Sequence, residues 1–294
     1  MKNIALAITF LLSINANTIW AENNATNSSE TKNVRYVKAP RFARPLVEKW
    51  ITEYAKTEPG VEFQIAKGSQ QQGVIDLNVV FNNQESPSQD VSHIVYFGKF
   101  AVLPITANGS EAAKVLEGRH LNSKKLKQLY FLDDKLEEET KKSNLFDNLV
   151  IYSGSNALSV SASFAHNLGE ENSNFRGKRV AGDDLFLNIA LSKDSLGISF
   201  NALPNIFDLK SRHVKDDLII IGIDVKKSLE DTFSNKGTLD ELISILENGK
   251  VSEVAIEKIG ISYNTTDDAV KQFLDWVLTT GTQYNHEFGL LNLK

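Results

Sequence analysis

The sequence predicts an α/β protein, and the order and connection of its elements carry the prediction. Residues 34–38 form a predicted strand, apolar residues at helical spacing follow from Leu46 to Tyr54, and residues 61–66 alternate as in a second strand. This strand–helix–strand order is typical of a sheet covered by helices. Predicted helices and strands stay interleaved to the end of the chain, and no long Pro/Gly linker separates sequential domains. If two lobes exist, we expect each to be built from discontinuous segments.

The boundaries of the elements follow from local signals. The first helix is expected to begin near Pro45 and to end at Glu58-Pro59-Gly60. Thr266 is expected to cap the last helix and Gly281 to stop it. Further strands are predicted as a pair at 91–96 and 100–105, and singly at 149–152, 197–201 and 218–225. Further helices are predicted at 110–116, 123–130, 157–168, 184–191, 239–246 and 270–278.

The composition indicates a folded, soluble protein and excludes several classes. Among 294 residues, 41% are hydrophobic and 23% charged, which argues against a disordered chain and against a multi-span membrane protein. The net charge of −5 gives no general attraction to phosphate backbones, so we expect no nucleic-acid partner. The chain has no cysteine, which excludes disulfides, thiolate metal sites and a cysteine nucleophile.

The N-terminus predicts export. Lys2 precedes an apolar run at 4–12 that is too short to span a bilayer, and Ala21 is a small residue at a plausible cleavage point. We interpret residues 1–21 as a signal peptide and 22–33 as a flexible polar leader. The alternative is a buried N-terminal helix or strand, which the polar leader could not pack. We therefore expect a periplasmic protein whose signal peptide is cleaved near Ala21.

No motif of the sequence indicates catalysis, a metal or a cofactor. The five histidines stand singly, and neither a Walker A sequence nor a GxGxxG turn after a strand is present. The adjacent carboxylates at 183–184 and 267–268 fall at predicted helix starts, where we interpret them as caps. Ser155 stands between a strand and a helix, as a hydrolase nucleophile does, but its neighbours depart from GxSxG at both glycine positions. We expect no enzyme.

Three turns before predicted helices are rich in small or hydroxyl residues, at 39–42, 68–73 and 153–156. A helix N-terminus presents unpaired N–H groups and a positive dipole end, so a serine there completes a site for an oxyanion. Two such turns that converge would hold one anion. The alternative is that Ser69 and Ser155 are ordinary helix caps.

The same turns carry a family resemblance. The run 42–50, Tyr54, the strand that begins at Val61, Gly68-Ser69 and Gly154-Ser155 resemble the periplasmic phosphate-binding protein of bacterial phosphate ABC transporters. The end of the chain, 270–293, is similar to the closing amphipathic helix and tail of that family. The resemblance implies a two-lobed, type II periplasmic-binding-protein fold with a ligand cleft. Lobe 1 would contain residues 34–102 and 255–294, and lobe 2 residues 103–254.

The resemblance also implies the ligand contacts and marks departures from the family. Position by position, it leads us to expect a cleft lined by Arg41, Phe42, Ser69, Gln70, Ser153, Ser155 and Asn156. Ile151 and Ala157 stand where the family has an arginine and a threonine, Arg41 stands where it has a threonine, and 82–86 offers no counterpart to its acidic residue.

Two functions remain open after these departures. The first is a secreted receptor for phosphate or a related small oxyanion, which would deliver its ligand to a membrane ABC transporter or another envelope assembly. The alternative is an accessory or scaffold protein of the cell envelope that keeps the binding-protein fold with a degenerate ligand site.

Overall fold

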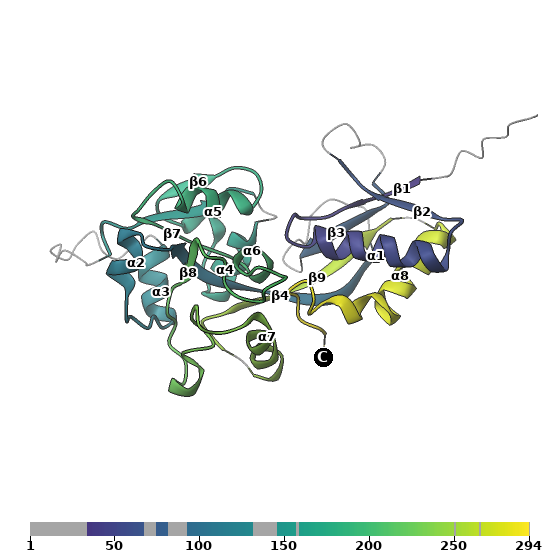
Figure 1. Cartoon of the computed structure of the whole chain (residues 1–294). Coiled ribbons are helices and arrows are strands. Elements are labelled where there is room, and N and C mark those ends of the chain that lie inside the picture. The colour runs from purple at the N-terminus through teal and green to yellow at the C-terminus, as the bar shows by residue number, and fades with distance from the viewer. Residues whose placement is uncertain are drawn as a thin grey trace, which may run out of the picture. The chain divides into compact units, whose positions relative to one another are not determined.

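One mixed β-sheet of nine strands runs through the described part of the molecule, as the computed structural model in Figure 1 shows. The structure describes residues 34–67, 75–81, 93–131, 146–156, 159–249, 251–264 and 266–293. The strands along the sheet lie in the order β2-β1-β3-β9-β4-β7-β5-β6, and β8 pairs with β4. The strands are β1 (Val34–Lys38), β2 (Glu62–Ile65), β3 (Leu77–Phe81), β4 (His93–Ala107), β5 (Val150–Gly154), β6 (Lys178–Val180), β7 (Gly197–Ala202), β8 (Leu218–Ile220) and β9 (Ala255–Tyr263).

Helices alternate with these strands along the chain and cover the sheet. They are α1 (Arg44–Thr57), α2 (Glu111–Leu116), α3 (Ser123–Tyr130), α4 (Val160–Asn167), α5 (Leu185–Leu191), α6 (Leu203–Ile206), α7 (Leu239–Asn248) and α8 (Asp268–Thr279). Short 3₁₀ helices lie at Asn172–Asn174, Lys227–Leu229 and Gly281–Tyr284. No helix within the described ranges combines the length and apolar character needed to cross a membrane.

Strand β4 connects two groups of elements (Figure 1). Its residues 93–102 pair antiparallel with β9, whereas 102–107 pair with β7 and β8. The predicted strand pair at 91–96 and 100–105 is therefore wrong, because both segments belong to one continuous strand, which pairs with β9 up to Val102 and with β7 from Val102 on, and they do not pair with each other. The register shifts between Tyr96 and Gly98, and this irregularity separates the two halves.

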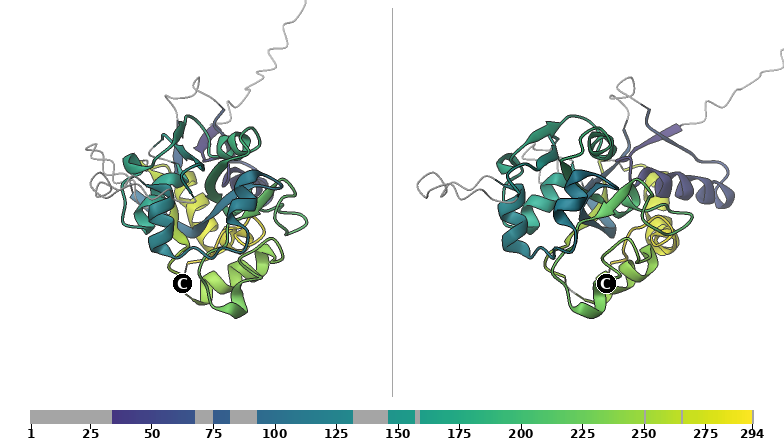
Figure 2. Two further views of the ribbon diagram at one scale, coloured as in Figure 1. Left: turned by 90° about the vertical axis from the view of Figure 1, so that its left-hand side faces the viewer. Right: turned by 60° about the vertical axis from the view of Figure 1, so that its left-hand side comes forward.

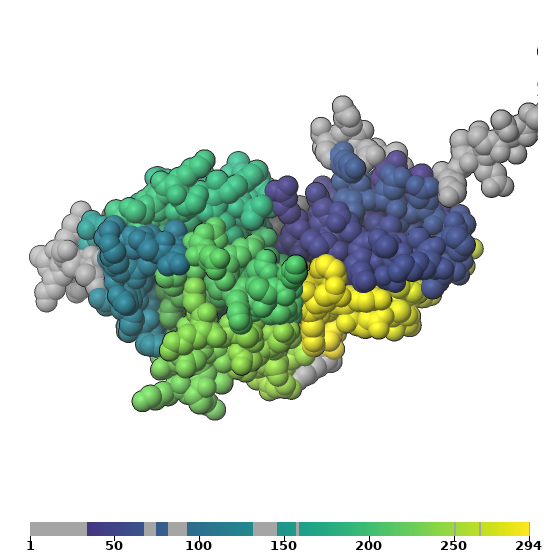
Figure 3. All heavy atoms as spheres, viewed as in Figure 1, coloured from purple at the N-terminus to yellow at the C-terminus, as the bar shows by residue number. Residues whose placement is uncertain are grey.

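The first group packs α1 and α8 against strands β1–β3 and β9. The Phe63 and Phe273 rings stack at 4.3 Å between centroids, and the Tyr54 ring meets Trp276 edge-on at 5.7 Å. Trp50 donates a buried indole N–H bond of 2.8 Å to the Gly281 carbonyl. These contacts join the two ends of the described chain, which share one face in Figure 3.

The second group has its own aromatic core. The rings of Phe164 on α4 and Phe200 on β7 stack at 4.3 Å, and Tyr130 of α3 meets Phe164 edge-on at 5.0 Å. The Tyr130 hydroxyl donates 2.9 Å to the Ser199 carbonyl, so its polar end is satisfied in the core.

The C-terminal segment after α8 turns back to α7, beside which Figure 2 places it. The Glu247 carboxylate of α7 accepts 2.6 Å from the Asn292 N–H and lies 2.8 Å from the His286 ring.

Several predicted boundaries are confirmed and others move. Strand β1 and helix α3 lie where they were predicted, and α1 ends at Thr57, just before Glu58-Pro59-Gly60. Helix α8 takes its cap from the Asp267 carboxylate instead of Thr266. Strand β8 ends at Ile220, short of the predicted 218–225. The predicted signal peptide (1–21), the leader (22–33) and the turn at 68–73 lie outside the described residues.

Candidate functional site

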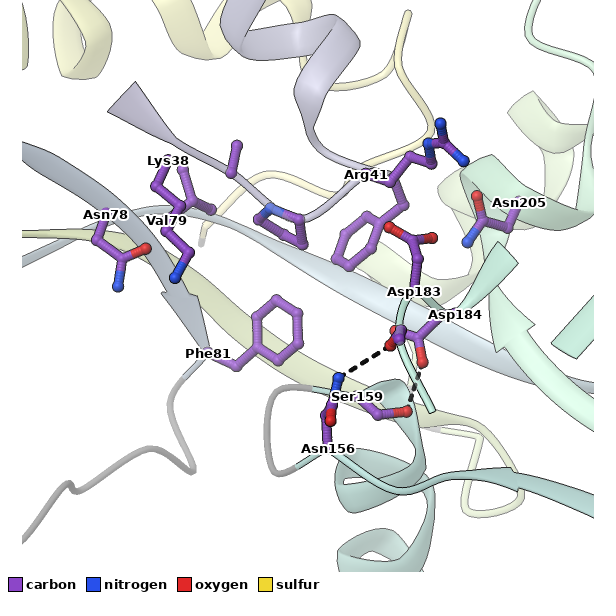
Figure 4. Close-up of a pocket in the computed structure, with 14 residues that line it drawn as sticks. Lys38, Arg41, Asn78, Val79, Phe81, Asn156, Ser159, Asp183, Asp184 and Asn205 are labelled. Carbon is purple, nitrogen blue, oxygen red and sulfur yellow. Dashed lines mark hydrogen bonds between the residues drawn. The ribbon is translucent and has the colours of Figure 1, made fainter. Parts of the chain in front are cut away.

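A cavity of about 220 Å³ opens where the turn after β1 faces the turns before α4 and α5 (Figure 4). One wall consists of residues 38–42 with Asn78, Val79 and Phe81 of β3. The opposite wall consists of Asn156, Ser159, residues 182–184 and Asn205. Segments far apart in the sequence thus form one site.

The turn after β1 positions an apolar floor and two cations. The Pro40 carbonyl accepts 3.0 Å bonds from the Ala43 and Arg44 N–H groups, which folds the chain tightly into α1. Phe42 is buried, with its ring 5.6 Å from Phe81 between centroids, so it closes the bottom of the site. Lys38 and Arg41 are exposed at the cavity, and neither pairs with a carboxylate of a described residue.

The N-terminus of α4 forms the facing wall. Ser159 is its cap, and its hydroxyl oxygen accepts 3.2 Å from the Ser161 N–H. Ser161 in turn accepts 2.7 Å from the Gly154 N–H at the end of β5. The sequence predicted Ser155 as the serine at this helix start, but the cap is Ser159, because the helix begins at Val160, three residues beyond the predicted start.

A carboxylate of the chain itself occupies this helix end. Asp184 accepts a short hydrogen bond from the Ser159 hydroxyl and a 3.1 Å bond from the Val160 N–H. Figure 4 shows the Ser159–Asp184 bond beside the cavity. The pKa of the Asp184 carboxyl is raised to about 6, chiefly by burial, against the lowering effect of its hydrogen bonds to Ser159 and Val160, and the neighbouring Asp183 charge adds to the rise.

The capping role predicted for the adjacent carboxylates is divided between two helices. Asp183 accepts 2.9 Å from the Leu185 N–H and so caps α5, as predicted. Asp184 makes no side-chain bond to α5 and caps α4 instead. Asp267 accepts 2.8 Å from the Ala269 N–H and 2.7 Å from the Arg35 guanidinium, in agreement with its predicted role.

Buried amides hold this wall from behind. Asn201 donates 2.8 Å to the Asp184 carbonyl and also 2.8 Å to the Asn188 side chain. Asn205 donates 2.9 Å to Asn201, and the Lys215 ammonium donates 2.8 Å to the Asn205 carbonyl. Burial lowers the pKa of Lys215. The network fixes the backbone of Asp184, so its carboxylate is held at α4.

The predicted site residues do not all meet at this cavity. Arg41, Phe42 and Asn156 line it, and Asn156 donates 2.9 Å to the Gly182 carbonyl. Ser153 is buried and accepts 3.1 Å from the Arg179 guanidinium, while the exposed Ser155 donates its N–H to the Val180 carbonyl at 2.9 Å. Neither serine lines the cavity. Ser69 and Gln70 lie outside the described residues.

Sequence reasoning missed Ser159, Asp183, Asp184 and Asn205 as site residues. Ser159 directly precedes a run of small residues, and this position is the one local signal that could have identified it as a cap. Asp184 lies beside a helix 24 residues earlier in the chain, a relation that no local pattern shows. Within the described ranges, no group of three or more His, Asp or Glu residues is placed to hold a metal ion.

Comparison with known proteins establishes the fold. No protein-family model and no curated protein sequence matches the chain. Among solved structures, a candidate phosphate ABC transporter substrate-binding protein from Clostridium perfringens, with phosphate bound, aligns at a TM-score of 0.60 and 13% identity, covering 89% of this chain and 100% of its own.

Two further structures agree. An ABC-type phosphate transport receptor from Vibrio cholerae aligns at a TM-score of 0.54 and 11% identity, over 88% of this chain and 100% of its own. The regulatory domain of CcmR from Synechocystis, in complex with 2-PG, aligns at 0.51 and 13% identity, over 84% and 97%. The chain therefore has the two-lobed α/β fold of type II periplasmic binding proteins, as the sequence predicted.

Proposed function

We propose that this chain is an exported, non-catalytic receptor that binds a small oxyanion in the cavity at Arg41 and delivers it to a membrane ABC transporter. The observation that carries the proposal is the cavity itself, with Lys38 and Arg41 on one wall and hydrogen-bonding side chains on the other. The structural neighbours, two of which are named as phosphate transport proteins, support a binding role for the fold.

The size and lining of the cavity favour a small anion. At about 220 Å³ it is smaller than the roughly 300–1,000 Å³ of most drug-sized sites. The Lys38 ammonium and the Arg41 guanidinium can each donate charge-assisted hydrogen bonds, and Asn78, Asn156 and Asn205 add amide groups. The Phe42 floor excludes water below the ligand.

Ligand binding would draw the two walls together. The division of the chain into lobe 1 (34–102 and 255–294) and lobe 2 (103–254) remains our proposal. A ligand that bonds both walls favours the closed form, and a transporter that recognises this form receives loaded protein. Export through a signal peptide at 1–21 is part of the same proposal.

Calorimetry tests the proposal. The purified chain is titrated with phosphate, sulfate, nitrate and formate, and at least one anion is expected to bind. Arg41→Ala should weaken that binding roughly tenfold or more, because a charged hydrogen bond contributes about 1.5–3 kcal/mol. Arg119→Ala, which removes an exposed arginine outside the cavity, is the matched control and should leave affinity unchanged.

A second candidate function is an envelope scaffold whose ligand site has degenerated. The Asp184 carboxylate favours it, because it occupies donors that an anion could use. An absence of heat with every anion would support the scaffold and contradict the receptor. Tight binding that Arg41→Ala leaves unchanged would place the anion elsewhere.

A further inference from the structure

We propose that Asp184 sets the charge selectivity of this cavity: its carboxylate holds the donors at the start of α4, so the site accepts a singly charged anion and rejects dianions. The inference rests on the proposed receptor function and specifies its ligand class.

Asp184 already occupies the two hydrogen-bond donors at the start of α4. Ser159 donates its hydroxyl hydrogen to Asp184, and the Val160 N–H is directed to the second carboxylate oxygen at 3.1 Å. A ligand oxygen that approached this point would compete with a carboxylate already in place. Asn201 anchors the backbone of Asp184 next to the start of α4, and the two bonds from Ser159 and Val160 hold the carboxylate there.

Two cations and two acids line the cavity. The cations, Lys38 and Arg41, come from the end of β1 and the turn after it, and the acids, Asp183 and Asp184, come from the turn before α5. With both acids ionised, these four charges cancel. A monoanion can meet the cations on the first wall, whereas a dianion brings a second negative charge toward the two carboxylates. Removal of the Asp184 charge leaves an excess of one positive charge for the dianion.

Protonation of Asp184 would change the charge of the cavity. The groups that act on the Asp184 carboxyl are Asp183 from its own turn and Ser159 and the Val160 N–H from α4, and Lys38 and Arg41 are the cations that line the same cavity. No histidine is among the described residues that line the site. A proton on Asp184 therefore removes the opposing charge, and dianions should bind better under mildly acidic conditions.

Sulfate is the probe for the test, because it remains a dianion across the mildly acidic and neutral range and donates no proton. The protein purified from the cell envelope is titrated with sulfate at pH 7.5 and pH 5. For the wild type we expect sulfate to bind at least tenfold more tightly at pH 5. For Asp184→Asn we expect affinity at pH 7.5 at least tenfold above that of the wild type, with the difference between the two pH values largely lost.

Two matched variants distinguish the effect of the Asp184 carboxylate at the start of α4 from the effect of any negative charge near the cavity. Asp184→Glu keeps the charge and should leave sulfate binding at pH 7.5 weak. Asp183→Asn removes a charge from the neighbouring residue, whose carboxylate caps α5, and should gain less than Asp184→Asn. Thermal unfolding checks that each variant is folded, and Asp184→Ser replaces Asp184→Asn if the latter is not.

The possible outcomes are distinct. Equal sulfate affinity in the wild type and Asp184→Asn, or an equal gain from Asp183→Asn, would overturn this inference. If the wild type still binds a monoanion through Arg41 in that case, the receptor function survives. If neither protein binds any anion, both proposals fail.

Discussion

Asp184 couples the stability of this fold to pH at the scale of a single residue. Burial, the largest cause, raises the pKa of its carboxyl from 3.8 to about 6. The folded state therefore holds the proton more tightly than the unfolded chain. The contribution of Asp184 to stability is greatest below about pH 4, falls as the pH rises to about 6, and stays low above that range.

Asp184→Asn should remove this dependence. A shift of roughly two pKa units corresponds to at most about 3 kcal/mol, and partial solvent exposure of the group reduces this, so we expect a relative change of about 1–2 kcal/mol. Urea unfolding of both proteins at pH 4, 5, 6 and 7 measures it. The wild type should lose stability relative to the variant as the pH rises, and parallel curves would contradict the raised pKa.

The same residues show how far local sequence patterns reach. Asp183 caps its own helix, so its position in the chain was enough to predict its role. Asp184 bonds a helix that precedes it, and the prediction of its partner was wrong. Ser155 and Ser159 both follow a strand and precede a helix, and only the actual helix start distinguishes the exposed serine from the cap.

At the scale of elements, local sequence patterns did not predict that β4 is one continuous strand. Gly98 lies between the two predicted strands, 91–96 and 100–105, and in the continuous strand this glycine serves a close approach of backbone. A Cβ at Gly98 would lie 2.8 Å from the Leu291 carbonyl oxygen. That carbonyl also accepts 2.8 Å from the Lys99 N–H, so it cannot withdraw without loss of the bond.

Gly98→Ala should therefore lower the free energy of unfolding by about 1–3 kcal/mol, the usual cost of overpacking. Gly60→Ala is the control, because nothing lies within 4 Å of a Cβ there, and its effect should stay within about 0.5 kcal/mol. Urea unfolding at neutral pH compares the two. Equal effects would show that the contact with Leu291 is not limiting.

Strand β9 was not predicted for a related reason. Glu257 is buried and Gly260 lies against β4, where a Cβ would come within 2.8 Å of the Val95 carbonyl. A charged residue and a glycine, both buried and on opposite faces of the strand, interrupt the apolar pattern by which strands are recognised. Helices α1 and α8, whose apolar stripes are regular, were predicted close to their observed bounds.

At the scale of the whole molecule, the order of elements predicted the fold better than it predicted the site. Element order needs only local patterns and the rules that connect them, and it led to the α/β fold now confirmed. The cavity brings Arg41 close to Asp183 and Asn205, which are more than a hundred positions away in the chain. Such a meeting depends on the packing of both groups of elements onto β4 and β9.

The central claim is that the cavity at Arg41 holds a small anion in the native protein. A crystal structure of the chain purified from the cell envelope, with no anion added, tests this most directly. We predict compact density between Arg41 and Asn156, within hydrogen-bond distance of Lys38 or Arg41 and with Asp184 still on the start of α4. A cavity that is empty or filled by side chains would contradict the receptor and support the scaffold.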